Sequence, residues 1–227
     1  MIRLALLLAV TTFAVDVSNG VAQDPKGYVA IGGLASITPT GEPPTGSVSF
    51  PGPGLGGTAA GFTVEAGRFV SRGLSVGFEA SMPLRFDGEQ FMGYFGNKEQ
   101  LESAHRDILF SGVVREGVPV GANASVGLEI GATVVFEDTV RQTAREIGVP
   151  PAPITYGPLG PEFTIRRGTL GLLVGADYDI RVTHRVDFVT QLRAYWVNRD
   201  NSVVNDTTVV GLGSFILRPA MGIRFIF

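Results

Sequence analysis

Residues 209–227 read VVGLGSFILRPAMGIRFIF. Successive side chains of a β-strand point to opposite sides, so alternate residues belong to the same face. One face of this stretch is apolar and consists of Phe215, Leu217, Pro219, Met221, Ile223, Phe225 and Phe227. The opposite face is mixed and carries Arg218 and Arg224. We therefore expect a strand with one apolar wall and one wall that holds two positive charges.

Seven earlier stretches have the alternation or the composition of strands. They cover about residues 27–37, 60–66, 74–82, 108–115, 126–136, 170–180 and 186–196. The most regular is 126–136, where Val126 and Leu128 alternate with Gly127 and Glu129. Such alternation is the signature of a strand with one apolar face. The chain is therefore expected to form eight strands, each near the roughly 9–11 residues that cross a bilayer as a tilted strand.

The connections between these strands alternate in length. Short turns follow the second, fourth and sixth strands, and long inserts follow the first, third, fifth and seventh. In an up-and-down arrangement, all short turns then lie at one end and all long inserts at the other. Within the inserts we expect short helical segments at residues 98–106 and 138–147.

The amino terminus has the pattern of a secretory signal. Arg3 supplies a positive charge, an apolar run extends from Leu4 to Val15, and Gly20 and Ala22 are the small residues near a cleavage site. This pattern predicts a signal peptide at residues 1–22 and one domain at residues 23–227. The apolar run is too short to span a membrane as a helix.

Composition excludes several classes of function. The formal net charge of −3 gives no support for nucleic-acid binding. The chain contains no cysteine and only two histidines, so neither a disulfide framework nor a zinc site is expected. We expect no cofactor.

The terminal aromatic strand, the even strand count and the sorting of connections by length together resemble the small eight-stranded bacterial outer-membrane β-barrels of the OmpA-like and OmpX-like type. The resemblance implies an all-β, eight-stranded antiparallel transmembrane up-and-down barrel in the bacterial outer membrane. It also implies that the last strand pairs with the first and is read by the barrel insertion machinery. That insertion signal would comprise Met221, Ile223, Phe225 and Phe227. The implied partners are outer-membrane lipid, lipopolysaccharide and the insertion machinery, and the implied state is a monomer.

Alternation by itself leaves two orientations open. A soluble, lipocalin-like barrel would turn the apolar faces inward, whereas a membrane barrel turns them outward. Aromatic residues near both ends of the apolar faces, such as Phe136 and Trp196 at one end and Tyr178 and Phe225 at the other, fit interfacial girdles and favour the outward orientation.

The outward orientation predicts a charged interior. Its acidic and basic members are Glu65, Glu79, Glu129, Asp177, Asp179, Asp187, Arg115, Arg193, Arg218 and Arg224. Enclosed charges are costly unless they are paired, so we expect a network of ion pairs. Glu65 and Glu79 should face each other and need a cation, and Arg224 should lie near Asp187 and Asp179.

The chain offers little for catalysis. His184 lies in a predicted short turn, and His105 lies near Ser103 and Asp107 in a long insert, where we expect a solvated cluster. We therefore expect no catalytic activity. The leading hypothesis is a structural or surface-interaction protein, with Arg166 and Arg167 among the candidate contacts for lipopolysaccharide phosphates. The alternatives are a narrow channel for ions or small solutes and a secreted barrel that carries an apolar ligand.

Overall fold

The computed structural model describes residues 27–41, 55–71, 73–94, 97–147, 155–199 and 212–227. These residues form ten antiparallel strands. The strands are β1 (Gly27–Thr38), β2 (Gly57–Phe69), β3 (Leu74–Pro83), β4 (Phe86–Tyr94), β5 (Asn97–Pro119), β6 (Ala124–Ile147), β7 (Thr155–Tyr156), β8 (Phe163–Thr183), β9 (Val186–Val197) and β10 (Phe215–Ile226). Within the described ranges, no helix has the length and apolarity to cross a membrane.

Eight of these strands close into a barrel, in the order β1–β2–β3–β5–β6–β8–β9–β10 and back to β1. The first and last strands pair along their length, and Gly27 and Phe227 exchange two backbone hydrogen bonds of 3.0 Å. The expected eight-stranded antiparallel up-and-down barrel, with its last strand paired to its first, is confirmed. The predicted signal peptide at residues 1–22 lies outside the described residues.

The short connections gather at one end of the barrel. They join β2 to β3, β5 to β6 and β8 to β9, and the two paired ends, Gly27 and Phe227, lie at the same end. In the β2–β3 turn, Gly73 has a φ of 87°, a conformation that residues with a Cβ rarely adopt. The turn thus depends on that glycine.

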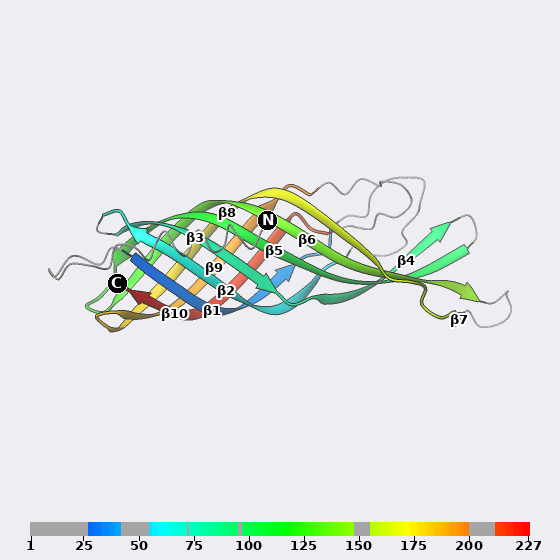
Figure 1. Ribbon diagram of the computed structural model, residues 1–227, viewed down its shortest axis with the longest axis horizontal. Coiled ribbons are helices and arrows are strands. Elements are labelled where there is room, and N and C mark those ends of the chain that lie inside the picture. The colour runs from blue at the N-terminus through cyan, green and yellow to red at the C-terminus, as the bar shows by residue number, and fades with distance from the viewer. Residues whose placement is uncertain (1–26, 42–54, 72, 95–96, 148–154, 200–211) are drawn as a thin grey trace.

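At the opposite end the sheet continues well beyond the barrel (Figure 1). The first half of β5 pairs with the second half of β6, and the pairing reaches Glu99 with Arg145. Strand β4 pairs with this part of β5, and β8 pairs with β6 as far as Phe163 with Arg141. The helices expected at 98–106 and 138–147 are therefore wrong. Both segments are strands, because cross-strand pairing outweighs a weak local preference for helix.

The apolar faces of the strands point outward. Leu172 is 66% exposed, whereas its neighbour Leu173 is 1% exposed, and the charged positions of the barrel strands are buried. Trp196 and Phe136 lie exposed toward the extended end, and Tyr178 and Phe225 toward the turn end. The barrel thus has an apolar exterior with aromatic residues near both rims.

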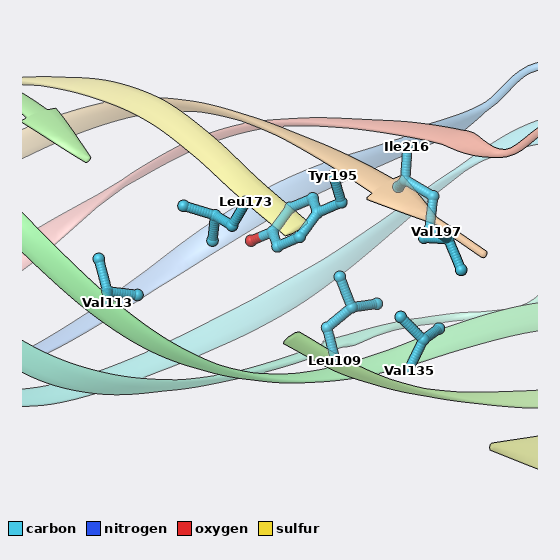
Figure 2. Packing of buried hydrophobic residues seen from close by; sticks show 7 residues of the cluster. All are labelled: Leu109, Val113, Val135, Leu173, Tyr195, Val197 and Ile216. Atoms are coloured by element: carbon cyan, nitrogen blue, oxygen red, sulfur yellow. The ribbon is translucent and has the colours of Figure 1, made fainter. Parts of the chain in front are cut away.

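The interior also contains an apolar layer that the alternation of the strands does not predict (Figure 2). It comprises Leu109, Val113, Val135, Leu173, Tyr195, Val197 and Ile216, each at most 3% exposed. The register explains their meeting, because Leu109 pairs with Val135, and Tyr195 pairs with both Leu173 and Ile216. This apolar layer fills the barrel on the side of the extended sheet.

Candidate functional site: the charged barrel interior

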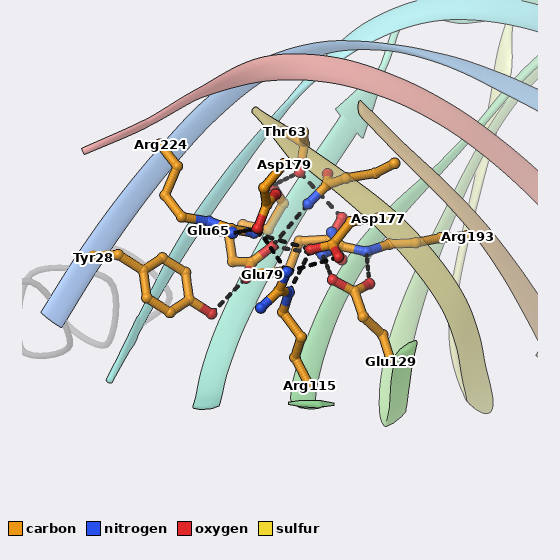
Figure 3. Close-up of polar contacts among 12 residues, drawn as sticks. Tyr28, Thr63, Glu65, Glu79, Arg115, Glu129, Asp177, Asp179, Arg193 and Arg224 are labelled. Atoms are coloured by element: carbon orange, nitrogen blue, oxygen red, sulfur yellow. Dashed lines mark hydrogen bonds and ion pairs between the residues drawn. The ribbon is translucent and has the colours of Figure 1, made fainter. Parts of the chain in front are cut away.

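Arg193 on β9 is the centre of the charged interior (Figure 3). Its guanidinium lies 2.5 Å from Glu65, 2.8 Å from Glu79 and 2.6 Å from Glu129. Glu65 and Glu79 are direct register partners on β2 and β3, so the hairpin places two like charges side by side. Arg193 supplies the cation that this pair requires.

Hydroxyl and amide groups complete the coordination of these carboxylates. Tyr28 donates a hydrogen bond of 2.7 Å to Glu65, and Thr63 and Tyr195 each donate one of 3.1 Å to Glu79. Because three carboxylates surround one guanidinium, neutral donors carry part of the stabilisation.

A second cluster lies nearer the turn end. Arg115 contacts Asp177 at 2.5 Å and Asp179 at 2.6 Å, and Arg224 contacts the same two carboxylates at 3.1 and 2.6 Å. The Arg224 guanidinium also lies 4.9 Å from the ring centre of Tyr28, a cation–π distance. In this cluster each of the two arginines forms an ion pair with each of the two aspartates.

Small residues make room for these long side chains. A Cβ on Gly127 would collide with the Asp177 carboxylate and the Arg115 guanidinium, and one on Gly67 would collide with the Tyr28 ring. An eight-stranded barrel is only wide enough for side chains to fill it, so glycines at these positions decide where the arginines fit.

Two members of the expected network have other partners. Asp187 pairs in register with Arg224, yet its ion-pair partner is Arg181 at 3.6 Å. Arg218 donates to the hydroxyls of Ser36 and Ser81 and, at 2.6 Å, to the backbone carbonyl of Asp107. Arg218 is thus held by neutral acceptors and lies apart from the carboxylates around Arg193.

The structure corrects the expectation for His105. This residue lies on β5 with its side chain inside the molecule and fully buried, so the expected solvated cluster is wrong. Its Nε2 lies 3.0 Å from Asp107, and its Nδ1 lies 2.7 Å from the hydroxyl of Thr139. The alternation of β5 continues through Ser103, His105 and Asp107, and this continuation is the signal that could have placed them inside.

Arg199 was not among the expected site residues. Its guanidinium contacts Asp107 at 2.6 Å and Glu137 at 2.8 Å, and its Nη1 donates to the carbonyl of Gly213 at 2.5 Å. Four apolar residues from three segments pack nearby at the same end of the barrel, namely Leu55, Ala59, Phe86 and Leu212. Phe86 lies with its ring edge against His105, with 5.4 Å between ring centres. Together these groups lie in the lumen at the extended end.

Within the described residues, the interior is therefore filled by a stack of buried polar and apolar side chains. A small, partly open pocket bordered by Thr63, Glu65 and Gln191 has room for about one water molecule. Among the described residues, no group of three or more histidine and acidic side chains is arranged to hold a metal ion. The protein is thus a β-barrel with an apolar exterior and a charged interior, the reverse of the arrangement in a water-soluble barrel.

The expected insertion-signal residues lie on the outer face of β10. Met221, Ile223 and Phe225 are exposed there, and Phe227 follows directly after the strand. The long insert after the predicted strand at residues 74–82 contains Phe91 and Tyr94, which lie in β4, and Phe95, which lies outside the described residues.

No protein-family model matches the chain, and no curated protein sequence matches it. Solved structures with a similar fold include Neisserial surface protein A, with 15% identity and a TM-score of 0.46 over 88% of this chain and 97% of that one. The outer membrane protein OprG from Pseudomonas aeruginosa has 9% identity and a TM-score of 0.49 over 90% and 97%.

A third similar structure is the outer membrane protease OmpT from Escherichia coli, with 9% identity and a TM-score of 0.43 over 93% of this chain and 99% of that one. Likeness at these levels carries no argument about the fold, ligand or activity of this chain.

Proposed function

We propose that this protein is a bacterial outer-membrane β-barrel with a closed interior and a structural or surface-interaction role, without catalytic activity. The observation that carries the proposal is that buried side chains fill the lumen at two successive levels. Arg193 ties together carboxylates from three other strands, and the apolar layer fills the next level. A path for water or ions would require both levels to separate.

The exterior supports the membrane location. Its exposed apolar side chains would be unfavourable in water over so large an area, and aromatic residues near both rims match the two interfaces of a bilayer. The predicted signal peptide at residues 1–22 provides the export route.

We propose further that the outward residues of β10, with Phe227 at the end, form the signal that the insertion machinery reads. Phe227 extends β10 and closes the seam with Gly27 by backbone hydrogen bonds. Deletion of Phe227 should slow insertion in cells while leaving unassisted refolding in detergent largely intact. Equal insertion of both forms in cells would contradict this role.

The geometry of His105 supports a role without catalysis. Both ring nitrogens are occupied, by Asp107 and Thr139, and the side chain has no exposed surface. A general base must reach the proton of a bound substrate, and this imidazole is enclosed.

One observation favours a narrow channel as a second candidate. Of the six buried polar atoms that lack a hydrogen-bond partner within the described residues, four lie on the turn-end side, namely Ser75 Oγ, Asp179 Oδ1, Asp187 Oδ1 and Arg224 Nε. Such atoms are usually hydrated, so a channel would admit water through that part of the lumen. The apolar layer still separates this region from the extended end.

Conductance separates the two candidates. The chain from Gln23 onward, refolded in detergent and inserted into planar bilayers, should stay silent over a range of pH and voltage. Discrete and reproducible openings would establish the channel instead. Heat-modifiable migration on a detergent gel and flotation with liposomes test the membrane location separately, and a chain that stays in solution without detergent would support the secreted alternative.

A further inference from the structure

Three arginines from separate segments converge on one carboxylate outside the barrel. Asp138 on β6 is the register partner of Arg106 on β5 and of Arg166 on β8. Arg85, from the link between β3 and β4, reaches the same group. We call these four residues the rim cluster.

The contacts within the rim cluster are specific. Arg85 donates to Asp138 Oδ2 at 2.9 Å, and Arg106 donates to the same oxygen from Nε at 3.0 Å and from Nη2 at 2.8 Å. The Arg166 Nε lies 3.8 Å from Oδ1. Asp138 itself is nearly buried, with a side chain that is 7% exposed, so it acts as the anchor around which the arginines are held.

The neighbouring residues indicate where the rim cluster lies relative to the membrane. Asp138 lies two residues beyond Phe136 on the same outward face, which is roughly 7 Å along a strand. Phe136 is exposed at the upper edge of the apolar exterior, and its ring lies edge-on to Phe110 with 5.8 Å between ring centres. An aromatic rim marks the boundary between hydrocarbon and headgroups, so the rim cluster lies at headgroup depth.

The charge of the cluster is unbalanced. Three guanidinium groups face one carboxylate, which leaves two positive charges in excess. The arginine side chains are 39%, 31% and 78% exposed for Arg85, Arg106 and Arg166, so donors remain accessible from outside. Planar guanidinium groups in a fixed arrangement suit phosphate, because each can offer two parallel N–H groups.

We propose that Arg85, Arg106 and Arg166, held by Asp138, bind a phosphate group on the headgroup of an outer-leaflet lipid such as lipopolysaccharide. The proposal rests on the outer-membrane location proposed above. A lipid-borne phosphate fits better than a free anion, because the cluster is continuous with the apolar exterior. One lipid can then place its chains against the apolar strands and its phosphate against the arginines.

Binding to the refolded protein in detergent tests the proposal without depending on insertion. The probes are lipopolysaccharide in mixed micelles, the same lipopolysaccharide after enzymatic dephosphorylation, and inorganic phosphate as a competitor. The native chain should bind the phosphorylated form at least about tenfold more tightly, which corresponds to about 1.4 kcal/mol. Millimolar inorganic phosphate should not displace it.

Two variants locate the site. Arg166→Glu should weaken binding by about tenfold or more, because it replaces an attractive charge with a repulsive one. The Arg166 side chain is largely exposed, so this change leaves packing intact. Arg106→Ala combined with Arg166→Glu should abolish the preference for the phosphorylated form. The matched control is Arg185→Glu, an exposed arginine in the turn at the opposite end, which should bind as the native chain does.

Unchanged affinity in a heat-modifiable Arg166→Glu variant would overturn the proposal. Competition by inorganic phosphate as strong as that by the lipid would also overturn it, because the site would then be a general anion site. Flotation with liposomes is measured in parallel. A chain that fails to insert would refute the membrane location, whereas a chain that inserts normally but ignores phosphorylation would refute only the rim cluster as a lipid site.

Discussion

The guanidinium of Arg193 lies 2.5 Å from the carboxylate of Glu65, although 128 residues separate them in the chain. Arg193 projects from β9 across the lumen to β2, and the same guanidinium reaches Glu79 on β3 and Glu129 on β6. One side chain therefore ties four strands together inside the barrel. The interior charges act as a structural connection, and their removal has unequal consequences that depend on what each arginine contacts.

Arg193→Ala should destabilise the barrel by about 3–5 kcal/mol, because it leaves buried carboxylates without their cation. Arg218→Ala should cost less, about 1–3 kcal/mol, since Arg218 contacts hydroxyls and a carbonyl and its loss leaves no unpaired charge behind. Urea unfolding in detergent micelles measures both. The exposed Arg185→Ala is the control, with an expected change within about 0.5 kcal/mol. Equal stability of all three variants would show that the interior network contributes nothing.

Leu173→Ala should destabilise by about 2–5 kcal/mol, because it opens a cavity in the apolar layer. Its neighbour Leu172 has the same chemistry but faces outward, where detergent or lipid fills the space of a missing side chain. Leu172→Ala should therefore cost clearly less in the same unfolding assay. If the two changes cost the same, or if Leu172→Ala cost more, the assignment of the two faces would be wrong.

Gly127→Val should destabilise by about 1–3 kcal/mol, because its side chain overlaps the Arg115–Asp177 pair and must displace it. Gly112→Ala is the matched control, since a Cβ at that outward position meets no atom within 4 Å. Thermal unfolding followed by gel mobility compares the two. A Gly127→Val variant as stable as the control would mean that Arg115 does not occupy the space above Gly127.

The rim cluster should make the base of the extended sheet sensitive to acid. Asp138 lies above the aromatic rim, outside the membrane-spanning part of β6. Burial raises the pKa of its carboxyl, but hydrogen bonds and charge from Arg85 and Arg106 outweigh burial and hold the pKa below its ordinary value. A group with a lowered folded-state pKa stabilises at pH values above its ordinary value, near 3.9 for aspartate, and this stabilisation disappears as the pH falls further.

The backbone amides of β5 and β6 around Asp138 should therefore be equally protected from hydrogen exchange between pH 7 and about pH 5, after correction for the intrinsic exchange rate. They should lose protection below about pH 4. Asp138→Asn should remove this step and show lower protection throughout. A native chain that follows the Asp138→Asn profile at every pH would contradict the contribution of this carboxylate.

Much of the barrel could be predicted because the strands that face lipid on one side must alternate. The alternation along residues 126–136 and 170–180 places each side chain on the correct face, and the sorted connection lengths orient the strands. The opposition of Glu65 and Glu79 also follows from the tight turn between their strands, because a hairpin determines its own register.

Other features depended on contacts that local patterns do not contain. Residues 98–106 and 138–147 have a polar, helix-compatible composition, yet they pair with each other as strands from the rim of the barrel outward. The apolar layer is visible in the sequence only as pairs such as Leu172-Leu173 and Val134-Val135, where both faces are apolar at once. Such pairs form a common layer only after closure brings five strands to the same level.

The sequence by itself determined the eight strands of the barrel, the separation of an apolar from a charged face along each of them, and the ends at which turns and long inserts lie; its aromatic residues near both ends of the apolar faces favoured the outward orientation of those faces. These properties follow from the two-residue period of a strand and from the residues that allow tight turns. Only the tertiary structure decided which arginine meets which carboxylate, that His105 is enclosed, and that three arginines share Asp138 at the rim. The physical reason is that these contacts depend on strand stagger and side-chain reach across a closed barrel, which bring together residues far apart in the chain.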